Sequence, residues 1–489
     1  MAEADFKGEF IRFLLETGAL KVGGDYNLKS GRISPVFANL GDFNDGNSLG
    51  ALADFYADAL IGSGVKFNLV YGIPEKGTII APAVTTALAR KGTNVSVFIT
   101  RKVPKEHGEA SNLSAAERIK KEVAGRVPKP GDVVAKLDDV FTTGEAKYDA
   151  VAKLDELGEL VGGKLERPIL VIGLDRQEVA ENGLSAIVEY ERRTGKRVVS
   201  VANVTDVYNF LKGQQLPIKT PSCEITEEGL RKVANYFRCY GTEESRKVFG
   251  KLEDELLGIP RSVVPALDVE DIKDVKDIVR AGKRNGKVVA FKVGLEQALW
   301  YGLPRVVGTI KSIFPEAVVI YDHQKAGTDI PALGMNFARV CKKSGVDAVI
   351  LFPESGPETE RAWMYHALNA GLKVLVGGWM THKAYAVSEG GWILDEKILE
   401  MYKVGARAGI RNYVVPGTKP QIIKQIRDVI VAEGIADPIL YSPGFLGKQG
   451  GVIEEAAAVA GDKFHAIAGT AIISAENRRA AMKMLTAKL

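Results

Sequence analysis

The second half of the chain alternates short apolar runs with longer amphipathic stretches. Stretches such as 271–286 and 399–409 repeat apolar residues at helical spacing and end in Gly, as a helix C-cap should. The β-branched runs between such stretches predict eight strands, at 263–268, 288–294, 317–322, 347–353, 373–379, 412–417, 438–444 and 464–469. Eight β/α alternations of this length predict a (β/α)8 barrel.

The first half alternates in the same way and begins with an amphipathic helical pattern. Its apolar runs predict strands at 68–74, 94–100, 132–141, 169–175 and 197–204, and hence a doubly wound α/β sheet. We interpret the Pro-rich segment 214–222 as a linker between domains at 1–213 and 223–489. The helical patterns that follow, up to residue 260, are interpreted as a lid or plug of the barrel.

Composition narrows the class of protein. The chain has 489 residues and a net charge of +4 with no polybasic arm or acidic tail, which argues against a nucleic-acid partner or disorder. No apolar run approaches the ~20 residues of a membrane span, and the three scattered cysteines form neither a disulfide framework nor a zinc site. We expect a cytoplasmic protein; the final Ala487-Lys488-Leu489 resembles a peroxisomal address only weakly.

Candidate chemistry in the barrel lies where its strands end, because barrel sites form at that face. Glycine-rich loops at 442–451 and 467–472 follow the last two strands and could hold a phosphate through backbone amides, or be plain turns. Polar or charged residues close several strands and could be site residues or structural ion pairs: Asp268, Lys292, Asp322, His323, Lys325, Asp329, Thr381 and His382.

Two segments of the first half suggest phosphate and ribose binding. Asp138 and Asp139 end an apolar strand, and Thr142-Thr143-Gly144 opens the next helix. Carboxylates can take ribose hydroxyls and a helix N-terminus can take a phosphate, although a helix cap beside a surface acid is equally common. The basic segment 101–109 suggests a loop that closes over a polyanion, or else a solvated face.

These motifs carry a resemblance to two families. LKSGRISPVFAN (28–39), GIPEKGT (72–78), RKVPKEHGE (101–109), LDDVFTTGEAK (137–147) and LDRQE (174–178) resemble orotate phosphoribosyltransferase in order and spacing. ALD (266–268), KVG (292–294), DHQKAGTDIP (322–331), SPGFLGKQGG (442–451) and AGTAIISAENRRAA (468–481) resemble orotidine 5′-monophosphate decarboxylase. Together they look like the fusion found in bifunctional uridine monophosphate synthases.

In the first domain the resemblance implies sites for orotate and phosphoribosyl pyrophosphate. Lys29 and Phe37 would contact the orotate ring, and Arg176 would pair with its carboxylate. Asp138 and Asp139 would hold the ribose. The 5′-phosphate would lie on Thr142, Thr143, Gly144, Glu145, Ala146 and Lys147. The pyrophosphate, with Mg²⁺, would lie on Lys76, Arg101, Lys102, Lys105 and His107.

In the barrel the resemblance implies a decarboxylase that needs no cofactor. Its catalytic array would be Lys292, Asp322, Lys325 and Asp329, with Asp329 reaching the neighbouring subunit of a homodimer. Asp268 would bind the ribose, and Thr381 and Gln449 would read the pyrimidine. The phosphate would lie on Gly469, Thr470 and the 442–451 loop.

Three positions depart from the family patterns. Glu145 places a carboxylate at the 5′-phosphate unless it points away or pairs with Lys147. Asp322, Lys325 and Asp329 are spaced one residue wider on each side than usual, so they can converge only if the strand bulges or has already ended. Thr470 replaces a phosphate-binding arginine, for which Lys448 is the candidate substitute.

Two other readings remain open. The barrel could be an aldolase-type relative such as a hexulose-phosphate synthase, which uses a similar Asp and Lys with Mg²⁺. The first half could be a nucleotide-sensing regulator, because the fold also serves binding roles. His366 and His465 have no candidate partner ligands and are interpreted as structural.

Overall fold

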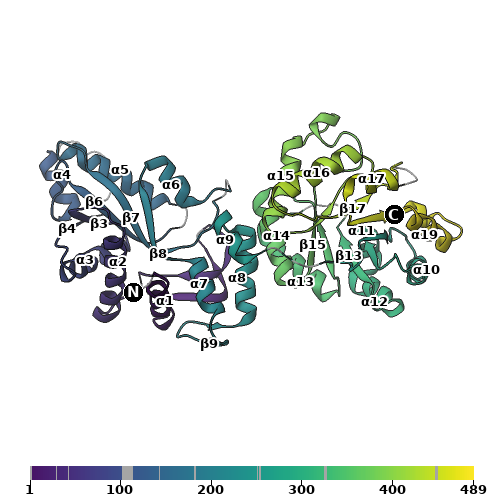
Figure 1. The fold of residues 1–489 in the computed structure, drawn as a ribbon, viewed down its shortest axis with the longest axis horizontal. Helices are drawn as coiled ribbons and strands as arrows, with labels where there is room; N and C mark the ends of the chain where they lie inside the picture. Colours follow the sequence, from purple (N-terminus) through teal and green to yellow (C-terminus); the bar gives the residue numbers. More distant parts are fainter. Residues whose placement is uncertain are drawn as a thin grey trace. The chain divides into compact units, whose positions relative to one another are not determined.

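The structure, a computed structural model, divides the chain into two compact units, Met1–Phe237 and Arg238–Leu489 (Figure 1). It describes residues 3–28, 30–41, 43–101, 114–141, 144–180, 183–250, 252, 255–323, 328–445 and 450–489. Nine of the candidate residues lie outside these ranges: Lys29, Lys102, Lys105, His107, Thr142, Thr143, Lys325, Lys448 and Gln449.

The first unit is built on a six-stranded sheet in the order β5-β4-β3-β6-β7-β8. Only β5 is antiparallel to its neighbour. The strands are β3 (Leu69–Gly72), β4 (Ser96–Thr100), β5 (Val123–Gly125), β6 (Val133–Phe141), β7 (Glu166–Asp175) and β8 (Arg197–Asn203). This confirms the doubly wound sheet. Its switch point lies between β3 and β6, where open α/β sheets bind ligands.

Helices cover both faces of this sheet (Figure 1). They are α1 (Glu3–Glu16), α2 (Gly46–Gly62), α3 (Gly77–Arg90), α4 (Ala115–Glu122), α5 (Glu145–Leu160), α6 (Ala186–Thr194) and α7 (Val204–Lys212). Figure 1 shows α5 and α6 on the face opposite α2 and α3. Leu154 and Leu157 of α5 and Tyr190 of α6 pack on Leu170 and Ile172 of β7 in one buried core. Because both faces are covered, the strands are apolar nearly throughout.

A hairpin that the sequence pattern did not predict stands beside the sheet. It consists of β1 (Leu20–Asn27) and β2 (Ile33–Ala38), and β10 (Glu224–Ile225) packs beside β1 after pairing with β9 (Ile218–Lys219). The backbones of Gly23 and Gly229 meet so closely that a Cβ on Gly23 would lie 2.8 Å from the Gly229 Cα.

The boundary between the units therefore differs from the expected one. It falls at Phe237, inside α8 (Glu227–Tyr240), and not in the 214–222 linker. Residues 223–237, which we expected as a lid of the barrel, pack on the first unit instead: Val22 N donates a hydrogen bond to Cys223 Sγ at 3.5 Å. An amphipathic pattern predicts that a helix forms but not which unit its apolar face covers.

The second unit is the expected barrel. Its parallel strands run in the order β11-β18-β17-β16-β15-β14-β13-β12. They are β11 (Arg261–Pro265), β12 (Ala290–Val293), β13 (Val318–Asp322), β14 (Ala348–Leu351), β15 (Lys373–Gly377), β16 (Asn412–Val414), β17 (Ile439–Pro443) and β18 (Phe464–Ala468). A bridge between Ala266 and Lys292, with Leu267 N donating to Lys292 O at 2.9 Å, joins β11 to β12 and closes the ring. Each strand overlaps one of the eight that the sequence predicted.

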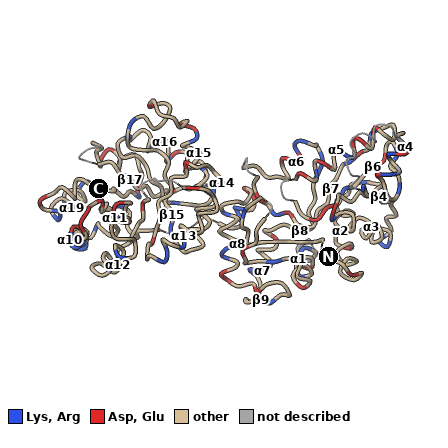
Figure 2. The backbone as a smooth tube through the Cα atoms, turned by 180° about the vertical axis from the view of Figure 1, so that it is seen from behind, with Lys and Arg blue, Asp and Glu red and all other residues tan. Residues whose placement is uncertain are grey.

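Helices surround the barrel and connect its strands (Figure 1). They are α9 (Glu243–Phe249), α10 (Ile272–Lys283), α11 (Leu295–Tyr301), α12 (Leu303–Ile313), α13 (Gly334–Lys343), α14 (Pro357–Asn369), α15 (Asp395–Arg407), α16 (Pro420–Ala432), α17 (Ile453–Ala460), α18 (Thr470–Ile473) and α19 (Arg478–Ala487). Within the described ranges, no helix of either unit is both long and apolar enough to cross a bilayer. Basic and acidic residues alternate along the backbone of both units (Figure 2).

His465 has the structural role that we expected. It lies on β18 inside the barrel, 2 % exposed, and its Nδ1 is 2.7 Å from the Ser262 hydroxyl. Burial and the nearby Lys463 lower the pKa of His465 to about 3, so the imidazole is neutral at physiological pH.

Candidate active sites

Three charged residues from adjacent strand ends meet at the barrel's carboxyl face. Lys292 on β12 is fully enclosed, and its Nζ lies 3.2 Å from Asp322 Oδ2 and 3.4 Å from Asp268 Oδ1. Burial alone would lower the pKa of Lys292, but the two carboxylates outweigh it and raise the pKa. The lysine is therefore a cation held between two acids.

Asp322 is the last residue of β13, which bears on the stretched spacing of the motif. Lys325 lies outside the described residues, so whether it converges with Asp322 stays a prediction. His323 does not face the lysine: its Nδ1 bonds the Tyr321 hydroxyl, and its ring packs on Phe337. Among the described residues, Asp322 Oδ1 is buried and has no hydrogen-bond partner.

Asp329 is not part of this cluster within the unit. It is exposed, and its Oδ1 accepts a hydrogen bond from the Ile330 amide at 2.8 Å. The backbone around it is anchored, because Ser355 Oγ donates to Thr328 O and Trp363 Nε1 donates to Ile330 O.

The other candidates of the barrel lie in loops after strand ends. Thr381 follows β15 and is half-buried, and Thr470, at the start of α18, is exposed. A Cβ on Gly469 would come within 4.0 Å of Asp268 Oδ2, so this glycine lies beside the cluster. A cavity of about 570 Å³ opens next to Asp268 and is lined by Leu295, Glu296, Leu299 and Trp300.

The paired aspartates of the first unit lie at the switch point, and each is bound to a lysine. Lys147 Nζ is 2.6 Å from Asp138 Oδ2, and Lys76 Nζ is 2.7 Å from Asp139 Oδ2. Burial raises the pKa of Asp138 to about 6, while Lys147 opposes and Asp139 reinforces the shift. Glu145 is exposed and Lys147 pairs with Asp138, so of the two alternatives left open for Glu145 the pair with Lys147 does not form.

Glycines bring this cluster together. Gly72 ends β3 and Gly77 begins α3, and a Cβ on Gly77 would lie 2.5 Å from the Leu137 carbonyl oxygen of β6. This close approach places Lys76 over the end of β6, where it also donates to Asn39 Oδ1 at 2.7 Å. Gly144 has a φ of 85° and forms the N-cap of α5, which begins with Glu145 and Ala146.

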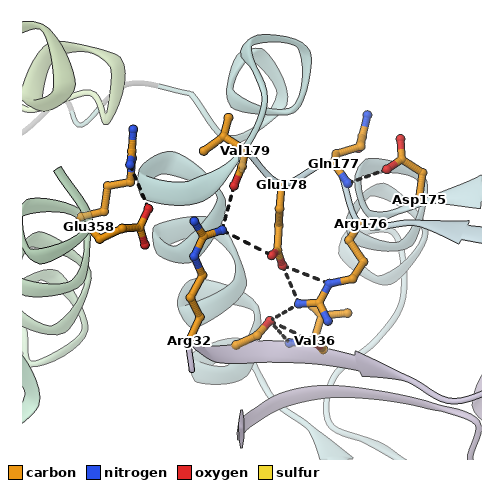
Figure 3. Close-up of polar contacts among 10 residues, drawn as sticks. Arg32, Val36, Asp175, Arg176, Gln177, Glu178, Val179 and Glu358 are labelled. Atoms are coloured by element: carbon orange, nitrogen blue, oxygen red, sulfur yellow. Dashed lines mark hydrogen bonds and ion pairs between the residues drawn. The ribbon is translucent and has the colours of Figure 1, made fainter. Parts of the chain in front are cut away.

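Arg176 follows β7 and already has an internal carboxylate partner (Figure 3). Its Nη2 donates to the Ser34 hydroxyl at 2.9 Å, and both Nε and Nη2 bond the same oxygen of Glu178. Arg32 Nη1 lies 3.8 Å from the other Glu178 oxygen and donates to Val179 O at 2.7 Å. Two guanidinium groups thus share one carboxylate.

Phe37 and Arg101 complete the described candidates of the first unit. Phe37 on β2 is half-buried, with the Tyr26 ring 6.0 Å away and Lys21 Nζ 5.9 Å from its own ring. Arg101 is exposed, and its amide donates to Glu122 O at 2.8 Å, so it emerges from the sheet where β4 ends. Among the described residues no group of three His, Cys, Asp or Glu side chains is arranged to hold a metal ion.

Sequence reasoning missed the partners of these residues. Nothing along the chain indicated that Lys147 bonds Asp138, since helical and strand spacing do not give tertiary contacts. Glu178 stands two residues after Arg176 in the LDRQE motif, which was the one available signal. The described structure brings together Asp268, Lys292 and Asp322 at one site, and Lys76, Asp138 and Asp139 at another.

The two halves of the chain are similar to two different families of known proteins. An orotate phosphoribosyltransferase of Saccharophagus degradans is 36% identical over 239 residues, which are 49% of this chain and 99% of that protein. The one from Alteromonas mediterranea is 38% identical over 207 residues, covering 42% of this chain and 88% of its own. Residues 261–485 match the family model described as Orotidine 5′-phosphate decarboxylase / HUMPS family.

Two solved structures are also similar. An orotate phosphoribosyltransferase of Francisella tularensis has a TM-score of 0.38 at 29% identity and covers 48% of this chain and 96% of its own. An orotidine 5′-monophosphate decarboxylase of Methanocaldococcus jannaschii has a TM-score of 0.41 at 25% identity, covering 47% and 99%. The chain belongs to the orotate phosphoribosyltransferase family through its first half, and its barrel matches the orotidine 5′-phosphate decarboxylase / HUMPS family.

Proposed function

We propose that the chain catalyses two consecutive reactions that end in UMP. The first unit joins orotate to phosphoribosyl pyrophosphate and releases pyrophosphate, and the barrel then decarboxylates the product, orotidine 5′-monophosphate. The observation that carries the proposal is the enclosed Lys292 between Asp322 and Asp268 at the barrel's carboxyl face, in a chain whose other half is an orotate phosphoribosyltransferase.

In the transferase step, breaking the bond at C1 builds positive charge on the ribose and negative charge on the leaving pyrophosphate. Cationic side chains that meet the leaving group lower this barrier. Lys76 and Arg101 lie at the ends of neighbouring strands of the sheet and are our candidates for this role. Mg²⁺, bound through the pyrophosphate oxygens, would neutralise further charge there.

The two aspartates of β6 would hold the ribose hydroxyls. Asp139 is bound to Lys76, the same residue that we place near the pyrophosphate. Substrate binding would therefore let Lys76 exchange a carboxylate of the protein for the oxygens of the leaving group. Arg176, beside Arg32 and Glu178, would take the orotate carboxylate.

In the decarboxylase step, the substrate carboxylate would lie against Asp322. Two carboxylates in contact repel each other, and the repulsion is relieved when CO₂ leaves, so the barrier falls. A lysine of the array would stabilise the carbanion at C6 and then protonate it. Lys292 is charged and enclosed, as this role requires, and no cofactor enters the reaction.

A homodimer would complete the barrel site. Ile330, next to Asp329, is 57% exposed, and Leu299 and Trp300, beside the cavity at Asp268, are 75% and 68% exposed. Apolar groups at the edge of a site favour burial against another surface. A second copy covering them would place its Asp329 in this site.

The test follows the ultraviolet absorbance of orotidine 5′-monophosphate mixed with the purified chain alone. We expect the substrate absorbance to disappear with the wild type and to persist with Lys325→Ala and Asp322→Asn. Orotate consumption in the presence of phosphoribosyl pyrophosphate should be unchanged in both variants. A wild type that consumes orotate but leaves orotidine 5′-monophosphate intact would contradict the decarboxylase half and favour another barrel reaction.

A further inference from the structure

Three successive backbone carbonyls after β15 are held by two neighbouring side chains. Thr418 Oγ1 donates to the Thr381 carbonyl at 2.8 Å. Lys419 Nζ donates to the carbonyls on either side, those of Met380 and His382, at 3.0 Å each. The segment that carries Thr381 is therefore fixed by a pair of residues, Thr418 and Lys419, which we call the 418–419 clamp.

The third proton of the Lys419 ammonium also has an acceptor. Glu389 Oε1 lies 2.5 Å from Lys419 Nζ and accepts a second hydrogen bond from Trp379 Nε1 at 3.3 Å. An ammonium has three donors, so Lys419 uses all of them on Met380, His382 and Glu389. Burial raises the pKa of Glu389, but the bonds from Lys419 and Trp379 outweigh it and hold the pKa below its usual range.

The clamp itself is fixed to the barrel by its backbone. Lys419 is the N-cap residue of α16, and its carbonyl accepts from Ile422 and Ile423. Gly417, one residue before the clamp, donates to Pro443 O of β17 at 3.0 Å, and a Cβ there would lie 2.5 Å from that oxygen. The 418–419 clamp therefore links the β15 loop to the next two β/α units.

This anchoring sets the direction of the amides in the segment. In a trans peptide the N–H points away from the C=O of the same unit. With the carbonyls of residues 380–382 bound to the clamp, the amides of Thr381, His382 and Lys383 point to the opposite side. Among the described residues these three amides have no hydrogen-bond acceptor within the protein, so each can donate to a bound molecule.

We propose that Lys419 and Thr418 are positioning residues for recognition of the pyrimidine base in the barrel. They touch no substrate; they hold the Thr381 segment in the conformation that reads the base. The inference rests on the proposed decarboxylase function, and it adds two residues, and Glu389 behind them, that the sequence motifs did not include.

The test compares two competitive inhibitors of decarboxylation, UMP and ribose 5-phosphate, which differ by the base. In Lys419→Met, whose side chain keeps the length but has no donor, we expect the UMP inhibition constant to rise about tenfold or more, the scale of a hydrogen bond to a charged group. Ribose 5-phosphate should inhibit with an unchanged constant. Thr418→Val should raise the inhibition constant of UMP by a smaller factor.

Lys424→Met is the matched control. Lys424 lies on α16, the helix that Lys419 caps; it is exposed and, within the described part of the chain, pairs with Asp428 at the surface. An unchanged inhibition constant of UMP in both clamp variants overturns the inference. An equal rise in the inhibition constants of UMP and ribose 5-phosphate also overturns it, because such a rise would indicate general damage to the site. A wild type that does not decarboxylate contradicts the proposed function itself, and this is seen before any variant is compared.

Discussion

Lys147 and Asp138 form an enclosed ion pair at the switch point of the first unit. Nζ and Oδ2 are 2.6 Å apart, both side chains are 6% exposed, and Lys147 also donates to Val140 O at 2.7 Å. The pair fixes a carboxylate that we expect to meet the ribose, and it takes Lys147 away from the phosphate loop. It therefore links the stability of the unit to the shape of the transferase site.

Lys147→Met should damage the transferase and leave the decarboxylase intact. Removing one partner of a buried pair leaves an uncompensated charge, which costs about 3–5 kcal/mol. We expect a lower melting temperature for the first unit and loss of orotate consumption. Lys153→Met on the same helix breaks only partly exposed pairs with Glu122 and Glu156 and should cost under ~1 kcal/mol. Equal melting temperatures for the two variants would contradict the prediction.

The sequence predicted the barrel more fully than it predicted the partners within each site. In a closed parallel barrel the carboxyl ends of all strands lie on one face. Asp268, Lys292 and Asp322 could therefore be grouped from their positions at strand ends in the sequence. The partner of Lys147 depends on how α5 is rotated over the sheet. That rotation is set by packing across the whole core and not by local spacing. The sequence therefore could not show that Lys147 pairs with Asp138 instead of binding the 5′-phosphate.

Lys292→Met should abolish the barrel reaction selectively. The variant removes the cation between Asp268 and Asp322, so the two acids lose their counter-charge where the carbanion would form. Loss of a proton-transfer or charge-stabilising group costs about 10²–10⁴-fold in rate. We expect that fall in decarboxylation with unchanged orotate consumption. The surface variant Lys424→Met should keep both activities, and a Lys292→Met chain within tenfold of wild-type decarboxylation would exclude the assigned role.

Arg176→Lys should weaken orotate binding more than phosphoribosyl pyrophosphate binding. Lysine keeps the charge but cannot bond Ser34 and Glu178 at once through a planar fork (Figure 3). We expect the KM for orotate to rise about tenfold or more, with the other KM nearly constant. Arg192→Lys, on α6 with an exposed guanidinium, is the control. A parallel rise in both KM values would place Arg176 in a structural role.

The loops of the first unit show why residue type alone does not predict what a cationic side chain binds. The fixed order of DRQE suggested a ligand for Arg176, yet Glu178 of the same motif already neutralises it. Likewise Lys76 was assigned to pyrophosphate, and in the structure it binds Asp139 and Asn39. Cations that serve an anionic substrate need a partner before the substrate arrives, and the sequence pattern does not say which acid provides it.

Lys136 should make the first unit more stable at alkaline pH. It is fully enclosed on β6, and its Nζ donates to the Tyr190 hydroxyl at 2.7 Å. Burial, with smaller contributions from Arg167 and Lys196, lowers the pKa of Lys136 to about 7, whereas a lysine in the unfolded chain keeps its ordinary pKa of 10.5. Between these two values the unfolded chain binds one more proton than the folded unit, so the stability of the unit rises with pH across that window.

Lys136→Met removes this proton linkage and keeps most of the side-chain volume. We expect the variant to be more stable than the wild type at pH 7 and the difference to shrink toward pH 10, by up to ~1.4 kcal/mol per pH unit. The measurement is the melting temperature of the first unit, followed by loss of orotate consumption, at pH 7, 8 and 9. Lys164→Met, whose lysine lies in the turn before β7, is the control for general alkaline effects. A constant difference between Lys136→Met and wild type across this range would show that the buried amine stays charged and is stabilised by Tyr190 alone.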